Sequence, residues 1–276
     1  MKTALVTDST ADLPAFLIEQ HGIRVVPAIL VIAGQSLEDG ADISREVFYQ
    51  RMPMLATPPT TATPSSGTFE RLYHELFEQG YEQIISIHVA NLLSGIYSTA
   101  KMAARAFGDR IQVIDSQSLS MGHGFQVVAA AEAIREGLGI TTILERIEAM
   151  RQRVHVFAML DTLEYVRRSG RVSWARARIG ALLNIKPFLE VRDGKVLNLG
   201  QARTRRKGID HLLELVRALG PLERLAVLHT NAEQEAHQML AALGVPVPRE
   251  PFFVNVTTVV GTHVGPNALG FAAVQV

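Results

Sequence analysis

The chain of 276 residues has no cysteine, and this absence excludes disulfides, thiolate metal sites and thiol nucleophiles. No apolar run approaches the roughly 18 to 20 residues that a membrane-spanning helix needs. An excess of one charge is also missing, because 27 basic residues balance 27 acidic ones, so no broad basic field favours nucleic acid. The first residues turn polar too early for a secretory signal. We therefore expect a cytoplasmic protein with no nucleic-acid partner and no stable membrane insertion.

Motifs of catalytic sites are scarce as well. The nine histidines include no HExxH zinc motif, so no metal site is expected. No GxGxxG follows the first predicted strand and no Walker lysine is present, so a nucleotide site is unsupported. Gly-x-Ser-x-Gly is missing too, although Ser94, His263 and an aspartate form a possible triad in principle.

What the sequence does contain is a strand, a glycine turn and a helix in immediate succession at residues 84–104 (IISIHVANLLSGIYSTAKMAA). A strand that leads into a helix through Ser94 and Gly95 leaves backbone N–H groups unpaired, and the helix dipole adds partial positive charge there. Such a corner is a possible anion-binding site, and the Ser94 hydroxyl can also donate a hydrogen bond to the anion. The alternative is that Ser94 is only an N-cap.

Hydrophobic patterning predicts an α/β protein. Strands near residues 4–7, 84–89 and 111–115 each end in small hydroxyl residues before a helix, and in an open α/β sheet such strand ends meet at one ligand-binding edge. Residues 24–32 are expected to form one strand interrupted at Pro27, and the proline-rich residues 53–69 an extended loop. A helix is predicted over residues 44–51, with Val47 and Phe48 on its inner side.

The pattern changes after residue 139. Asp193-Gly194 between two β-rich runs is a strong hairpin signal, and short strands are expected at residues 252–255 and 258–260. Arg171 follows Ser169-Gly170 in a turn, where it is either a solvated helix end or an anion partner. His263 lies in a glycine-rich turn, where it is either structural or part of a site. We expect two domains, residues 1–155 and 156–276.

Seven segments together resemble the DegV family of lipid-binding proteins. They are TDSTADLP (7–14), PTTATPSSGTF (59–69), LSGIYSTA (93–100), IDSQSLSMGHG (114–124), RRSGRVS (167–173), LLNIKPFL (182–189) and GTHVGPNALG (261–270). The resemblance implies a two-domain α/β fold, with a mostly parallel sheet flanked by helices in the N-terminal domain and a mixed sheet in the C-terminal α/β domain. It also implies one long-chain fatty acid, such as palmitate, in an apolar tunnel, and no cofactor.

The resemblance further implies a role as the acyl-binding, non-catalytic subunit of a bacterial fatty-acid kinase. A separate ATP-dependent subunit would phosphorylate the carboxylate for phospholipid synthesis. Carried over by motif, the carboxylate contacts fall on Thr61 and Ser94, with Arg171 and His263 facing the head group or the partner. The plausible tunnel walls, each of which is alternatively ordinary core, are Phe157, Met159, Leu182, Leu183, Ile185 and Phe188.

Two motifs depart from the family pattern. The usual Thr-Ser-Gln-Pro-Ser has Ala62 and Thr63 at its second and third positions here, and the usual His-Thr-Gly-Pro-Gly has Val264 and Asn267. Both carboxylate contacts remain. Two other functions compete with the kinase subunit: an enzyme, either a hydrolase that uses Ser94 or a phosphotransfer protein that uses His263, and a lipid-responsive regulatory or transport protein without a kinase partner.

Overall fold

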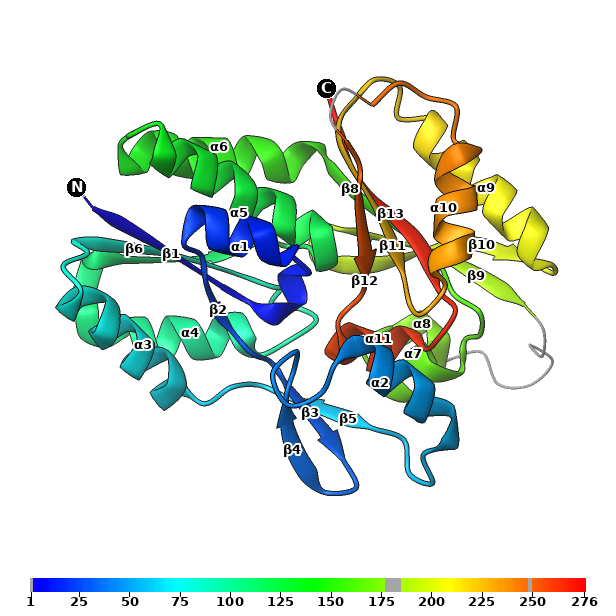
Figure 1. The fold of residues 1–276 in the computed structure, drawn as a ribbon, viewed down its shortest axis with the longest axis horizontal. Helices are drawn as coiled ribbons and strands as arrows, with labels where there is room; N and C mark the ends of the chain where they lie inside the picture. The colour runs from blue at the N-terminus through cyan, green and yellow to red at the C-terminus, as the bar shows by residue number, and fades with distance from the viewer. Residues whose placement is uncertain (1, 177–184, 248–249) are drawn as a thin grey trace.

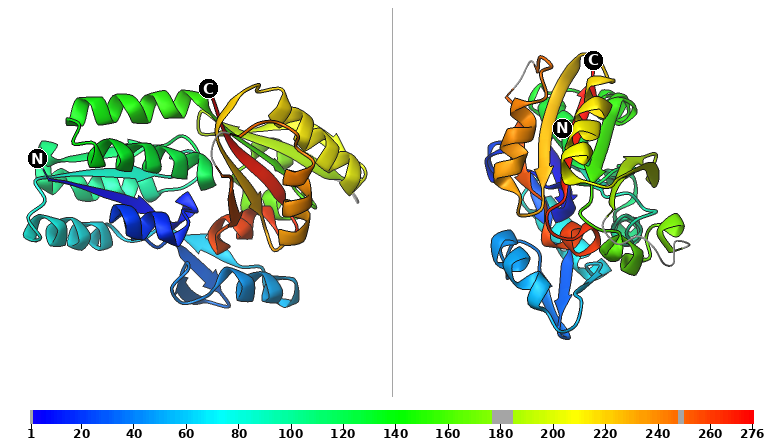
Figure 2. Two further views of the ribbon diagram at one scale, coloured as in Figure 1. Left: turned by 45° about the horizontal axis from the view of Figure 1, so that its top comes forward. Right: turned by 90° about the vertical axis from the view of Figure 1, so that its right-hand side faces the viewer.

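The computed structural model describes residues 2–176, 185–247 and 250–276. It is an α/β fold with two larger sheets, placed side by side in Figure 1, and one small sheet. In both views of Figure 2 the small sheet and the helix beside it, in shades of blue, lie at the bottom of the molecule.

The first sheet is parallel, as predicted, with the strand order β2-β1-β6-β7. Its members are β1 (Thr3–Asp8), β2 (Arg24–Val26), β6 (Gln83–His88) and β7 (Ile111–Asp115). Helices cover both faces, which explains why Ile84, Ile85 and Ile87 of β6 are all completely buried and why the strand is apolar without alternation. On one face lie α3 (Ser66–Glu78) and α4 (Ile96–Ala104), and on the other α1 (Ala15–His21) and α5 (Ser120–Arg135).

The second large sheet is mixed, in agreement with the resemblance, and has the order β10-β9-β8-β13-β11-β12. Only the β11–β12 pair is parallel. The predicted hairpin at Asp193-Gly194 is confirmed, and both residues have positive φ, 51° and 72°, as a tight two-residue turn requires. The strands are β8 (Val154–Met159), β9 (Lys186–Arg192), β10 (Lys195–Ala202), β11 (Leu222–His229), β12 (Phe252–Asn255) and β13 (Leu269–Gln275).

The two faces of the mixed sheet are covered differently. Helices α9 (Arg205–Arg217) and α10 (Glu233–Ala241) pack on the outer face. On the inner face, α5 and α6 (Ile140–Arg153) share one core with residues of both large sheets. The predicted division between residues 155 and 156 falls within β8. The two halves of the chain pack together through this shared core. A division into two domains at this position therefore stays a prediction.

The small sheet and the segments around it differ from the sequence-based expectations. Pro27 divides the predicted strand into β2 and β3 (Ile29–Ile32), which belong to different sheets, since β3 pairs with β4 (Gln35–Glu38) and β5 (Thr60–Ala62). The expected loop at residues 53–69 therefore contains a strand. In α2 (Arg45–Arg51), capped by Ser44 as predicted, Phe48 is buried but Val47 is 38% exposed.

The expected strand at residues 258–260 is also wrong, because these residues begin α11 (Thr258–Val264). The short elements that remain are η1 (Ser9–Ala11), η2 (Met52–Met54), η3 (Arg105–Arg110), α7 (Glu164–Ser169) and α8 (Ser173–Arg176).

Candidate functional site

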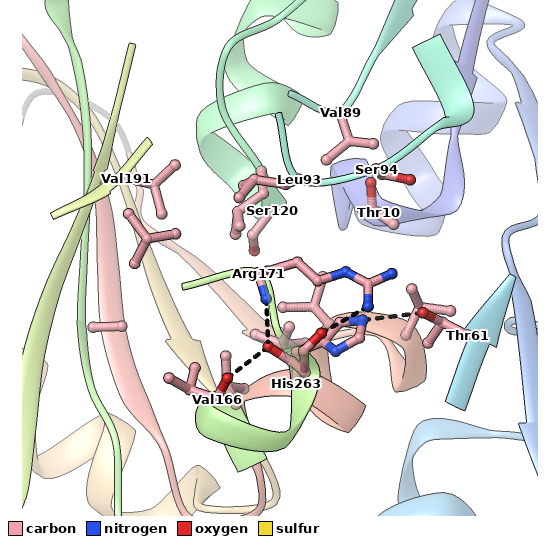
Figure 3. Close-up of a pocket in the computed structure, with 18 of the residues that line it drawn as sticks. Thr10, Thr61, Val89, Leu93, Ser94, Ser120, Val166, Arg171, Val191 and His263 are labelled. Atoms are coloured by element: carbon pink, nitrogen blue, oxygen red, sulfur yellow. Dashed lines mark hydrogen bonds between the residues drawn. The ribbon is translucent and has the colours of Figure 1, made fainter. Parts of the chain in front are cut away.

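A cavity of about 440 Å³ lies between the inner face of the mixed sheet and the carboxyl ends of the first sheet. The mixed sheet contributes alternate residues of β8, including Val156 and Ala158, and the first sheet contributes the segments that follow β1 and β6. Helices α7 and α11 complete the wall (Figure 3). Its volume is within the range of small-molecule sites.

The wall is aliphatic. Among the residues that the structure describes, no Phe, Tyr or Trp lines the cavity, and Arg171 is the only lining residue with a permanent charge. The apolar lining residues with branched side chains are Val89, Leu93, Ile96, Leu119, Val156, Leu160, Val166, Val172, Leu189, Val191, Val196, Leu228, Val256, Val259, Val260 and Val264. Such a surface favours a hydrocarbon over a polar molecule.

The predicted wall residues that the structure describes do not line this cavity. Phe157, Met159 and Phe188 point to the opposite face of the mixed sheet, where they pack beneath α9 and α10. Their neighbours Val156 and Ala158 face the cavity instead, because successive side chains of a strand alternate between faces. The prediction was therefore wrong about the face.

The other three predicted wall residues have different outcomes. Ile185 is buried in a separate cluster with Leu160 and Val166 and does not line the cavity either. Leu182 and Leu183 lie outside the described residues.

The four predicted polar residues, in contrast, all line the cavity: Thr61, Ser94, Arg171 and His263 (Figure 3). Thr61 comes from β5 and His263 from α11, and their Oγ1 and Nε2 atoms are 3.0 Å apart. Ser94 precedes α4, whose N-terminal residue Ile96 donates its amide to Ser94 Oγ at 3.4 Å. The sequence segments that carry these residues are far apart in the chain, and the fold gathers them around one cavity.

Hydroxyl groups around the cavity divide into two sets. Seven serine and threonine residues line it, and four of them donate their protons to the protein: Thr10 to Asp8, Ser120 to Asp12, Ser169 to the Val166 carbonyl and Thr230 to the Gly265 carbonyl. In the described part of the chain, Thr61, Thr63 and Ser94 are the lining hydroxyls without such a fixed acceptor. Only these three can donate a proton to a ligand without breaking a bond inside the protein.

The protonation of His263 determines what Thr61 can do. Burial lowers the pKa of His263 to about 4, and the nearby positive charge of Arg171 acts in the same direction, so the imidazole is neutral near pH 7. Its Nδ1 atom is buried without a partner. Because an orphaned buried N–H is rarer than an orphaned acceptor, we assign the proton to Nε2. The imidazole then donates to Thr61 Oγ1, and the Thr61 proton is directed elsewhere.

Arg171 lies at the exposed rim of the cavity. Helix α7 ends at Ser169, and Gly170 at φ 70° reverses the chain so that Arg171 folds back. Its Nη1 atom donates to the Ser169 carbonyl at 2.8 Å and its amide to Ser169 Oγ at 3.2 Å. The guanidinium is therefore held beside the cavity, where its charge attracts an anion.

A buried polar chain supports the first-sheet side of the cavity. Asp8 Oδ2 accepts from His88 Nδ1 at 3.0 Å and from the Val89 amide at 3.1 Å, while Ser86 and Tyr73 extend the chain beyond His88. Burial raises the pKa of Asp8, but the His88 hydrogen bond, the charge interactions with His123 and His88 and the Thr10 hydrogen bond together lower it to about 2. The carboxylate thus holds Thr10 and Val89 in the cavity wall.

Neither possible catalytic serine has the geometry of a hydrolase nucleophile. Ser86 neighbours His88 and Asp8 but is completely buried and does not line the cavity. Ser94 does line the cavity, but the described contacts give it no hydrogen bond to His263, which is bonded to Thr61. A serine nucleophile requires an adjacent base.

Sequence reasoning missed Thr10, Ser120 and His229 as lining residues. A signal for two of them was present, since Thr10 and Ser120 follow strands of the predicted parallel sheet. His229 ends β11, and no local motif marks it. Its Nδ1 accepts the Ala232 amide at 3.3 Å, and burial lowers the pKa of His229, so it presents a neutral ring.

The described residues contain neither a metal-binding cluster nor a membrane-spanning helix. No group of three or more His, Asp or Glu side chains there is arranged to hold a metal ion. No described helix is long and apolar enough to cross a membrane.

Fold and cavity together define an α/β protein with an internal aliphatic site. The profile of the family described as "Uncharacterised protein, DegV family" matches residues 2–276. Protein DegV of Bacillus subtilis is 35% identical over 277 aligned residues, which cover 98% of each chain. The chain belongs to the DegV family.

Solved structures agree with this assignment. A structure described as showing fatty-acid binding of a DegV family protein from Thermus thermophilus has a TM-score of 0.91 and 34% identity, with all of both chains covered. The structure of DegV from Bacillus subtilis, described as a fatty acid binding protein, has a TM-score of 0.88 and 32% identity over the full length of both chains.

Proposed function

We propose that this protein binds one long-chain fatty acid, with the acyl chain in the aliphatic cavity and the carboxylate between Thr61 and Ser94. The observation that carries the proposal is the supply of hydroxyl protons: four of the seven described lining hydroxyls donate to the protein, and Thr61 and Ser94, together with Thr63, do not. Family membership and the fatty-acid binding described for the Thermus thermophilus and Bacillus subtilis proteins support it.

The two parts of the ligand have different roles in this proposal. Each buried methylene contributes about 0.8 kcal/mol, so a chain of about sixteen carbons supplies on the order of 10 kcal/mol before entropic losses. Two hydrogen bonds from hydroxyls to a carboxylate supply about 3 to 6 kcal/mol, much of it offset by desolvation. Affinity therefore comes mainly from the acyl chain, and the hydroxyls set the position of the carboxylate.

We further propose that the protein is a non-catalytic subunit which presents the carboxylate to a separate ATP-dependent kinase in the cytoplasm. The attacking oxygen in acyl-phosphate formation belongs to the fatty acid, so this chain needs to supply only orientation, while the kinase supplies ATP. His263 orients Thr61, and Arg171 at the rim offers a positive charge to the phosphorylated head group or to the kinase. The acyl-phosphate would then enter phospholipid synthesis.

Two experiments test these steps in order. Solvent extraction of the purified protein followed by mass spectrometry is expected to yield a fatty acid near one equivalent, and recovery of none after incubation with palmitate contradicts the binding proposal. Addition of a fatty-acid kinase subunit and ATP is then expected to convert the bound acid to acyl-phosphate. Binding without that conversion favours the regulatory or transport alternative. Ester hydrolysis lost in Ser94→Ala would instead identify a hydrolase.

A further inference from the structure

Helix α11, which carries His263, has no N-terminal cap of its own. Within the described residues, the side chain of its N-cap residue Thr257 makes no capping hydrogen bond, and the Thr257 hydroxyl oxygen is buried without a partner. The first amides of a helix have no acceptor within the helix, so a buried N-terminus needs acceptors from elsewhere. Here they come from two aspartates more than 200 residues earlier in the chain.

Asp12 is the first of these acceptors. Its Oδ1 accepts the Thr257 amide at 2.8 Å and lies 3.5 Å from Arg45 Nη1, and its Oδ2 accepts the Ser120 hydroxyl at 2.5 Å. Burial raises the pKa of Asp12 to about 6, against the opposing effects of Arg45, Ser120 and the Thr257 amide. This carboxyl group connects the segment after β1, the start of α5 and the start of α11.

Asp39 is the second acceptor. Its Oδ1 accepts from the Thr258 amide at 3.1 Å and from the Thr258 hydroxyl at 2.6 Å. Tyr49 of α2 adds a bond to the Val256 carbonyl at 2.9 Å. A Cβ atom at Gly261 would lie 2.1 Å from the Tyr49 hydroxyl oxygen, so glycine at that position is what allows α2 to approach α11.

The opposite side of α11 forms part of the cavity wall through Val259, Val260, His263 and Val264. We propose that Asp12 and Asp39 are positioning residues that hold α11, and with it the His263 imidazole, against Thr61. Two acidic groups at a helix N-terminus also interact favourably with its dipole. The role of the imidazole in ligand binding rests on the proposed function. The position of the imidazole against Thr61, however, can be measured in the ligand-free protein.

The test is histidine NMR on ligand-free Asp12→Asn, Asp39→Asn and the double variant, with Glu38→Gln as the matched control. Glu38 is exposed and adjacent to Asp39 in sequence. Release of α11 is expected to raise the pKa of His263 by at least about one unit, a tenfold rise in proton affinity, and to mix the two tautomers. The control is expected to match the wild type. An unchanged His263 pKa and tautomer in a folded double variant overturns the proposal.

A milder variant covers the case in which the double variant does not fold. Thr258→Val keeps the volume and removes only the hydroxyl that donates to Asp39, and it is expected to move the His263 signals in the same direction by a smaller amount. No movement in this variant also overturns the proposal. None of these spectra requires a lipid, so the two proposals can fail separately. Shifted His263 signals in the variants support the positioning role even if the wild-type protein does not bind palmitate. In that case only the proposed function is contradicted.

Discussion

Thr10 and Thr61 both line the cavity, but their hydroxyl groups differ in whether they can donate a proton to a ligand. The Thr10 proton is taken by Asp8, whose low pKa keeps the carboxylate ionised. Thr61 accepts from the neutral His263 in the tautomer that leaves Nδ1 as an acceptor, so its own proton faces no competing acceptor. Residue type alone does not distinguish these two threonines, because the difference depends on partners distant in the sequence.

Removal of the Thr61 hydroxyl tests this distinction. Thr61→Val keeps the shape of the side chain, and loss of one hydrogen bond to a charged group is expected to reduce fatty-acid affinity by about 1.5 to 3 kcal/mol, or roughly 10- to 150-fold. Affinity for the methyl ester, which carries no charge, is expected to change much less. Calorimetric titration of both ligands provides the measurement.

Thr60→Val is the matched control for this prediction. Thr60 is the exposed neighbour of Thr61 in β5 and does not line the cavity, so its replacement is expected to leave both affinities unchanged. Equal weakening of acid and ester binding by Thr61→Val would argue against a carboxylate contact.

The pH dependence of His263 provides a second prediction at this scale. Its pKa is about 4 in the folded protein, against about 6.5 for an unperturbed histidine, so the unfolded chain binds more protons between these two values. The contribution of His263 to stability is therefore complete above pH 6.5 and is lost as the pH falls through 4. Nitrogen-15 NMR is expected to show a neutral ring at pH 5.5. A ring already protonated at that pH would contradict the burial argument.

At the scale of single elements, β8 shows what sequence patterning can and cannot predict. The segment VHVFAML was correctly predicted to be a strand, but all of its residues except Ala158 are buried. A strand covered on both faces has no polar alternation, so the sequence carries no sign of which alternate set faces a cavity. Phe157 and Met159 were assigned to the wrong face for this reason.

Other local errors have related causes. The β-branched residues 257–260 favour a strand, but the amides of Thr257 and Thr258 donate hydrogen bonds to Asp12 and Asp39, and these bonds support a helix there. Tertiary contacts of this kind override propensity. The four polar site residues, in contrast, were found through the motifs that contain them, because these motifs retain Thr61, Ser94, Arg171 and His263 unchanged.

The two faces of β8 can be separated by mutation. Ala158→Phe is expected to fill the cavity next to Gly270, its partner on β13, and to reduce fatty-acid affinity by at least about tenfold, with an overpacking cost of about 1 to 3 kcal/mol. Phe157→Leu on the opposite face is expected to lower the free energy of unfolding by about 0.5 to 3 kcal/mol and to leave affinity unchanged. Denaturant unfolding and calorimetric titration measure the two effects. Loss of binding in Phe157→Leu alone would reverse the assignment of faces.

At the scale of the whole molecule, the cavity wall and the shared core join the two halves of the chain. The core that contains α5 and α6 includes residues of both large sheets, so exposing either half alone would leave apolar surface uncovered. The change from the first sheet to the mixed sheet comes before β8, and the predicted boundary between residues 155 and 156 falls inside that strand.

We expect the two halves to unfold together. Trp174, the single tryptophan, donates to the Val196 carbonyl at 3.1 Å and reports on the C-terminal half, whereas far-ultraviolet circular dichroism reports on all helices and strands. The two denaturant transitions are expected to coincide. Palmitate at a hundredfold excess over its dissociation constant is expected to raise the unfolding free energy by about 2.7 kcal/mol. Two separate transitions, or a ligand effect on only one probe, would indicate independent domains.

Strand β13 lies between β8 and β11, in the interior of the mixed sheet, although it is formed by residues 269–275. During translation, therefore, β8 and β11 emerge from the ribosome long before the strand that must be inserted between them. The cavity wall of the nascent chain is therefore incomplete until residues 269–275 leave the exit tunnel. A chain interrupted before residue 269 would therefore expose the aliphatic side chains of the cavity wall to chaperones and proteases.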